Sequence, residues 1–183
     1  MKKVILSVLA GIILSVAVSF FSHKNSLENL GFHLGLYNIA GEEKAIEETL
    51  KLFNKHFGTF FNTGGKLEGL SEFPASNLIK RRIFQEINEW TKKNQILVYD
   101  KDSFKIEEIT LFNSATAIAV AKEVWFLNVQ ERDTRKKISP VKANPIRVRY
   151  VIKKLEGMWR VVEYEVFSNE NDIPALTKDR LLL

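Results

Sequence analysis

The chain has 183 residues, of which 45% are hydrophobic and 11% aromatic, so it can fill one hydrophobic core and is not a disordered protein in bulk. It has no cysteine, which excludes disulfides, thiol catalysis and cysteine-based zinc sites. Its net charge of +5 comes from 27 basic residues spread among 22 acids, so we expect no nucleic-acid partner.

An uncharged, apolar segment opens the chain. Residues 4–21 follow Lys2 and Lys3, and this length lies at the lower edge for a membrane-spanning helix. We expect a transmembrane anchor or signal peptide over residues 1–24, with a buried core helix as the remaining alternative. The preceding lysines place the N-terminus in the cytoplasm of a bacterial-type cell and the rest outside it. Small residues ending at Ser19 would permit cleavage, which would release a periplasmic or secreted form.

Two helices are predicted after an apolar, glycine-containing tether over residues 25–41. Apolar residues recur three or four apart over residues 42–61, and Asn62-Thr63-Gly64-Gly65 ends this first helix. Pro74-Ala75-Ser76-Asn77 begins the second. Its inner face is expected to comprise Leu78, Ile79, Ile83, Ile87 and Trp90.

After Asn94 the hydrophobic period changes to two, which indicates β-strands over residues 96–99, 104–112, 115–129, 146–155 and 159–167. A charged loop covers residues 130–145, and a polar tail, expected to be poorly ordered, covers residues 169–183.

The register of the last hairpin follows from its side chains. A three-residue loop of Glu156, Gly157 and Met158 keeps apolar residues opposite apolar ones and sets acid against base. The pairs it predicts are Tyr150 with Tyr164, Val148 with Val166, Ile152 with Val162, and Arg149 with Glu165.

Three segments carry a resemblance to a known family. They are the first helix, the alanine-striped strand Ala115-Thr116-Ala117-Ile118-Ala119-Val120-Ala121, and the closing hairpin with its Gly157-Met158-Trp159 turn. Over residues 42–168 this pattern resembles the nuclear transport factor 2-like (NTF2-like, or SnoaL-like) superfamily. The resemblance implies an α+β cone in which N-terminal helices pack inside a strongly curved antiparallel sheet, here joined to an N-terminal transmembrane or signal helix.

The resemblance also bears on function. Two branches combine this domain with a single membrane anchor: the C-terminal domains of plastid and cyanobacterial division proteins, and the VirB8-like and TcpC-like assembly domains of secretion machines. Both are scaffolds. We therefore expect a membrane-tethered, extracytoplasmic interaction module that is non-catalytic and binds a protein partner or a second copy of itself. The alternative is a small-ligand-binding or isomerase/hydrolase-like pocket protein, because the same fold also hosts such proteins.

Catalytic candidates are few. They are His56, Tyr99, Asp100, Tyr150 and Tyr164. Four of them have a simpler structural interpretation: Asp100 opens a turn-like Asp-Lys-Asp, Tyr150 and Tyr164 form a packing pair, and His56 neighbours the apolar face of a helix. With a single histidine in the domain, we expect no metal site and no cofactor.

Partner-contact candidates lie in one strand and in the charged loop. Trp125 and Phe126 make their strand apolar on both faces. We therefore expect both faces to be covered, one by a helix and the other by a partner or a second copy of the chain. The basic loop contributes Arg135, Lys136 and Lys137.

Overall fold

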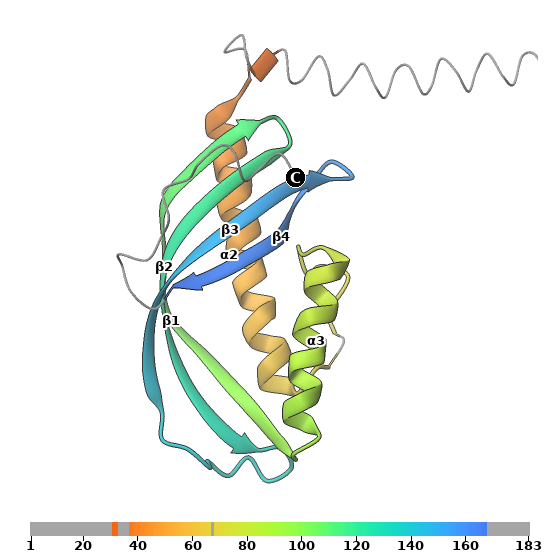
Figure 1. The fold of residues 1–183 in the computed structure, drawn as a ribbon, viewed down its shortest axis with the longest axis vertical. Helices are drawn as coiled ribbons and strands as arrows, with labels where there is room; N and C mark the ends of the chain where they lie inside the picture. The colour runs from red at the N-terminus through yellow and green to blue at the C-terminus, as the bar shows by residue number, and fades with distance from the viewer. Residues whose placement is uncertain (1–30, 33–36, 67, 168–183) are drawn as a thin grey trace, which may run out of the picture.

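The computed structural model describes residues 31–32, 37–66 and 68–167. In chain order, the elements are α2 (Ile39–Thr63), α3 (Asn77–Thr91), β1 (Gln95–Asn113), β2 (Thr116–Glu131), β3 (Lys142–Leu155) and β4 (Met158–Phe167). The four strands form one antiparallel sheet in sequence order, and both helices lie on its concave side (Figure 1).

The expected fold class needs correction. The structure is an α+β fold, but it consists of a four-stranded antiparallel sheet with two helices in place of the predicted cone joined to a transmembrane or signal helix. Across residues 31–32, 37–66 and 68–167, none of the helices has the length and apolarity needed to cross a membrane. Residues 4–21, where the span was predicted, lie outside the described residues, as does the predicted tail over residues 169–183.

Helix α2 begins three residues before the predicted start, because Asn38 caps it. The Asn38 side chain accepts a hydrogen bond from the Gly41 amide at 3.0 Å. At the other end Gly64 adopts a left-handed conformation with φ of 67°, as a glycine after a helix commonly does. The predicted stop is therefore confirmed.

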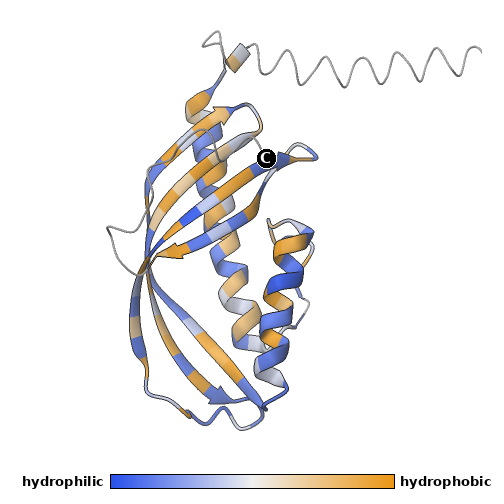
Figure 2. Ribbon diagram, viewed as in Figure 1, coloured by the Kyte–Doolittle hydropathy of each residue, from blue (hydrophilic) through white to orange (hydrophobic). Residues whose placement is uncertain are grey.

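Helix α3 starts where predicted, with Ser76 as its cap. Its buried face comprises Ile79, Ile83 and Ile87, which are four residues apart. Leu78, predicted to lie on the same face, is 65% exposed, because it is rotated about 100° from Ile79 around the helix. Figure 2 shows the resulting alternation of hydrophobic and hydrophilic residues along helices and strands.

The two strands predicted over residues 96–99 and 104–112 are a single strand, β1. Its register against β2 shifts between Lys101 and Ser103, so the apparent turn at Asp100-Lys101-Asp102 is an irregularity within a continuous strand. A bulge inserts one unpaired residue and bends a strand without ending it. Further shifts occur between Ile106 and Glu108 and between Leu111 and Asn113, which suits the strong bend of this long strand (Figure 1).

The closing hairpin confirms most of the predicted register. Tyr150 pairs with Tyr164, Val148 with Val166, and Arg149 with Glu165. The loop is shorter than predicted, however. Leu155 pairs with Met158, so only Glu156 and Gly157 form the turn, with φ of 54° and 79°. Positive φ at both positions is the signature of a type I′ turn.

A bulge at Val162 reconciles the short turn with the predicted pairs. Ile152 pairs with Val161 rather than with Val162, and the register shifts between Val151 and Ile152. The extra residue changes the alternation of β4, so that Trp159 and Val161 are buried before the bulge while Tyr164 contacts the core after it.

The core forms between α2, α3 and the concave face of the sheet. Ala117, Ala119 and Ala121 of β2 are each 0% exposed and belong to this core. The segment before α3 pairs with the sheet edge, where Ala75 bridges Val161 in parallel. This bridge places the start of α3 beside β4.

A candidate binding cavity with a buried glutamate

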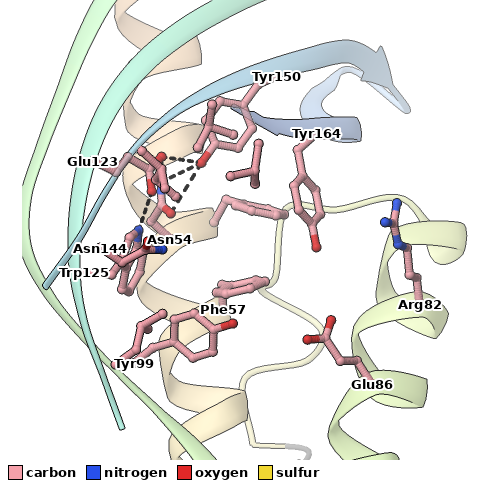
Figure 3. A pocket seen from close by; sticks show the side chains of 15 residues that line it. Asn54, Phe57, Arg82, Glu86, Tyr99, Glu123, Trp125, Asn144, Tyr150 and Tyr164 are labelled. Carbon is pink, nitrogen blue, oxygen red and sulfur yellow. Dashed lines mark hydrogen bonds between the residues drawn. The ribbon is translucent and has the colours of Figure 1, made fainter. Parts of the chain in front are cut away.

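A cavity of about 290 Å³ lies between the helices and the sheet. On β2 it is lined by Glu123, Trp125 and Leu127, which follow the alanine stripe at the same spacing of two. Its lining comprises Phe53, Asn54, Phe57, Arg82, Glu86, Tyr99, Glu123, Trp125, Leu127, Asn144, Ile146, Val148, Tyr150, Tyr164 and Val166. All six elements therefore contribute to it (Figure 3).

Glu123 is the central polar residue, only 2% exposed. Its Oε1 accepts hydrogen bonds from the Tyr150 hydroxyl at 2.5 Å and from Asn54 Nδ2 at 3.4 Å. Its Oε2 accepts one from Trp125 Nε1 at 2.7 Å (Figure 3). Burial raises the pKa of this carboxyl, although the three donors act in the opposite direction.

The cavity wall is mostly aromatic. The Phe57 ring lies at its centre, with centroid distances of 5.2 Å to Tyr99, 6.2 Å to Trp125 and 6.2 Å to Tyr164, all edge-to-face. Tyr99 and Trp125 are themselves perpendicular at 5.7 Å. Edge-to-face contacts of this kind are favourable and hold the rings in defined orientations.

Tyr99 is positioned by the end of α2. The Asn62 side chain accepts from the Tyr99 amide at 2.7 Å and donates to the Tyr99 carbonyl at 2.8 Å. Asn62 therefore occupies the place of a neighbouring strand at this edge of the sheet and holds the Tyr99 ring against the cavity. Burial is also the main cause that raises the pKa of the Tyr99 phenol, with Glu86 adding to it.

The rim of the cavity carries two charges from α3. Arg82 and Glu86 are one helical turn apart, and the Arg82 guanidinium lies 5.8 Å from the Tyr164 ring centroid. In Figure 3 the Glu86 carboxylate and the Tyr164 hydroxyl both point into the space between α3 and the sheet.

Three of the five catalytic candidates line this cavity, namely Tyr99, Tyr150 and Tyr164. Asp100 is exposed and does not line it. His56 is buried on α2 between Phe60 and Phe73, and its Nε2 has no hydrogen-bond partner within the described residues. Burial lowers the pKa of this imidazole.

The predicted contact residues fall in different environments. Trp125 is 4% exposed in the cavity wall, and Phe126 is half-buried beside it. The basic residues lie in the exposed β2–β3 connection, where the Arg135 guanidinium donates to the Asn62 carbonyl at 2.8 Å. Lys136 and Lys137 are exposed. Their role as contacts stays a prediction.

Sequence reasoning missed Glu123, Asn54, Glu86 and Arg82. One signal for Glu123 was available, because it follows Ala117, Ala119 and Ala121 at the same spacing of two and so belongs to the inward face. No local signal identified its partners. In the part of the chain that the structure describes, no group of three or more potential metal ligands occurs.

Comparison with solved structures identifies proteins of similar fold. No family model and no curated protein matches the chain. The intermembrane space region of chloroplast protein ARC6 aligns with a TM-score of 0.59 and 12% identity, over 69% of this chain and 96% of that one. An NTF2-like protein of unknown function from Prochlorococcus aligns with a TM-score of 0.34 and 18% identity, over 49% and 63% of the two chains. The likeness to the ARC6 region shows a shared α+β fold.

Proposed function

We propose that the domain is an NTF2-like, non-catalytic interaction module that binds a protein partner at the mouth of its cavity. The observation that carries the proposal is the hydrogen bonding of Glu123. Both of its oxygens already accept hydrogen bonds from side chains of the domain. These bonds hold the carboxyl group to three side chains of the domain itself, which supports a structural role for Glu123.

Two further observations support binding. The sequence resembles NTF2-like scaffold domains, and the ARC6 region has the same fold. The cavity is open enough to admit a side chain, and Val166 on its wall is 51% exposed. An apolar residue exposed beside a cavity offers a contact for an incoming protein segment.

A second candidate function is a small-ligand or isomerase/hydrolase-like pocket. It is favoured by the burial of a carboxyl with a raised pKa inside a cavity, since perturbed groups of this kind occur at catalytic sites. The interaction module predicts that a protein contacts the rim of the cavity in the cell, whereas the pocket protein predicts no such contact. A cross-linking experiment distinguishes the two candidates.

The test introduces a photoactivatable phenylalanine analogue into the full chain, in cells that require the protein. At Val166 it should give one defined adduct of higher mass. At Leu78, which is 65% exposed and does not line the cavity, it should give none. Equal adducts at both positions, or none at Val166 in cells where the protein functions, would refute the interaction module.

A further inference from the structure

The cavity contains a carboxylate that forms no ion pair with a residue of the lining; Lys101, which acts on it electrostatically, does not line the cavity. Glu123 is 2% exposed, and all three of its hydrogen-bond donors are neutral groups. Within the described residues, no ion pair includes it. A buried charge is strongly disfavoured unless another charge compensates it.

The other charges of the lining do not supply that compensation. Arg82 is the lining's one basic residue, and it interacts with Glu86 on the same helix face. One cation therefore faces two carboxylates. An anionic ligand would meet a net negative cavity, whereas a cationic one would remove the imbalance.

The walls also suit a cation. Phe57, Tyr99 and Trp125 form a cluster of rings beside Glu123, and Tyr164 closes the side toward α3 (Figure 3). Aromatic faces attract ammonium groups, most strongly in desolvated sites, and cages of such rings are a recurrent means of recognising them. The Tyr99 and Tyr164 hydroxyls make no hydrogen bond within the described part of the chain, so both can accept from a bound N–H group or water.

From this geometry we infer that the cavity binds an organic ammonium group, with Glu123 as its counter-charge and the rings of Phe57, Tyr99, Trp125 and Tyr164 as its cage. The inference deepens the proposed function, because the ammonium group can belong to a lysine side chain of the protein partner. A free small amine carries the same chemistry, and the experiment separates these two sources.

The experiment uses the purified full chain and two pairs of probes, with binding measured by titration calorimetry. Choline is compared with its neutral isostere 3,3-dimethyl-1-butanol, and Nα-acetyl-lysine methylamide with the norleucine analogue. Each ammonium probe that enters the cavity should bind at least about tenfold more tightly than its neutral match. Tighter binding of the lysine probe identifies a protein side chain as the source, and binding of choline alone identifies a free amine.

Variants locate the site. Glu123→Gln should lower affinity for the ammonium probe by about tenfold or more while leaving the neutral probe unchanged. Because this buried change can unfold the domain, Glu86→Gln on the exposed rim is a second test, and it should weaken binding severalfold. Its matched control is Glu89→Gln on the same helix, since Glu89 pairs with Lys92 at 2.6 Å and does not line the cavity.

Equal affinity for charged and neutral probes, or no binding of either ammonium probe, would overturn the inference. So would equal effects of Glu86→Gln and Glu89→Gln. These failures leave the proposed function intact if Val166 still cross-links to a partner. Loss of that adduct with ammonium binding retained would overturn the protein-partner proposal instead.

Discussion

The indole nitrogen of Trp159 donates a hydrogen bond to the Glu42 carboxylate at 2.6 Å, which joins the last strand to the first turn of α2 across 117 residues. Lys154 of β3 pairs with the same carboxylate at 2.8 Å. Glu42 therefore connects the start of α2 to both strands of the closing hairpin.

Removing this indole should be costly. Trp159 is 5% exposed, so Trp159→Ala should lower the free energy of unfolding by about 3–5 kcal/mol. The neighbouring Met158 is 53% exposed, and Met158→Ala is the matched control, with an expected loss below about 1 kcal/mol. Urea denaturation measures both. Similar losses in the two variants would show that the indole does not anchor the hairpin.

The type I′ turn offers a stabilising change. Glu156 has a φ of 54°, which is strained for a glutamate but common for asparagine. Its ion pair with Arg160 is long, at 3.9 Å, and Glu156 is 86% exposed, so little is lost with it. Glu156→Asn should therefore raise the free energy of unfolding by about 0.5–1 kcal/mol. Gly157→Ala, which introduces a Cβ at a φ of 79°, should lower it. A melting temperature unchanged by either substitution would contradict the turn assignment.

Glu123 should make the stability of the domain depend on pH. Its pKa is raised in the folded state by burial, so the unfolded chain loses this proton first as the pH rises from about 4. The free energy of unfolding of the wild type should thus fall with rising pH relative to Glu123→Gln, which carries no proton to lose. Urea melts across this range measure the slope. A wild type and variant with parallel curves would show that burial does not perturb this carboxyl. The exposed Glu163→Gln is the control.

His56 should act in the opposite direction. Burial lowers the pKa of its imidazole in the folded state; Glu72 opposes that effect, and Lys55 and Lys80 add to it. As the pH falls below about 6.5, the unfolded chain binds this proton first, so the folded state loses stability. His56→Gln should lose less stability than the wild type over that interval, as measured by thermal melts.

In cells, His56→Ala and Asp100→Asn should leave function intact wherever the protein folds. Loss of function in a variant with unchanged melting temperature would favour the pocket enzyme.

The closing hairpin illustrates how far sequence patterns reach. Alternation correctly opposed Tyr150 to Tyr164 and Arg149 to Glu165. It misplaced the turn because a two-residue turn followed by one bulged residue gives the same distant pairs as a three-residue loop. The two arrangements differ only in the pairs from Ile152 to Leu155, next to the turn, and both keep Ile152 and Leu155 opposite apolar residues.

The site was less predictable than the fold, since its polar residues converge through tertiary packing. Glu123 bonds to Asn54 and Tyr150, which are 69 and 27 residues away in the chain. Their meeting depends on how α2 packs against the sheet, because Asn54 lies on the helix while Glu123 and Tyr150 lie on two different strands. Spacing within one strand indicates that Glu123 faces inward, but it contains no information on which helix residue it meets.

The position of α2 also determines the order in which the domain can fold. This helix is synthesised before the sheet, yet Asn54 contacts Tyr150 and Glu42 contacts Trp159, residues that leave the ribosome about a hundred positions later. Its apolar face, with Ile46, Leu50 and Phe53, is not fully covered until then, because Phe53 packs against Tyr150 and Tyr164. Closing such long loops precedes most of the stabilising contacts, so folding should be slow for a domain of this size and should be completed only after β4 is synthesised.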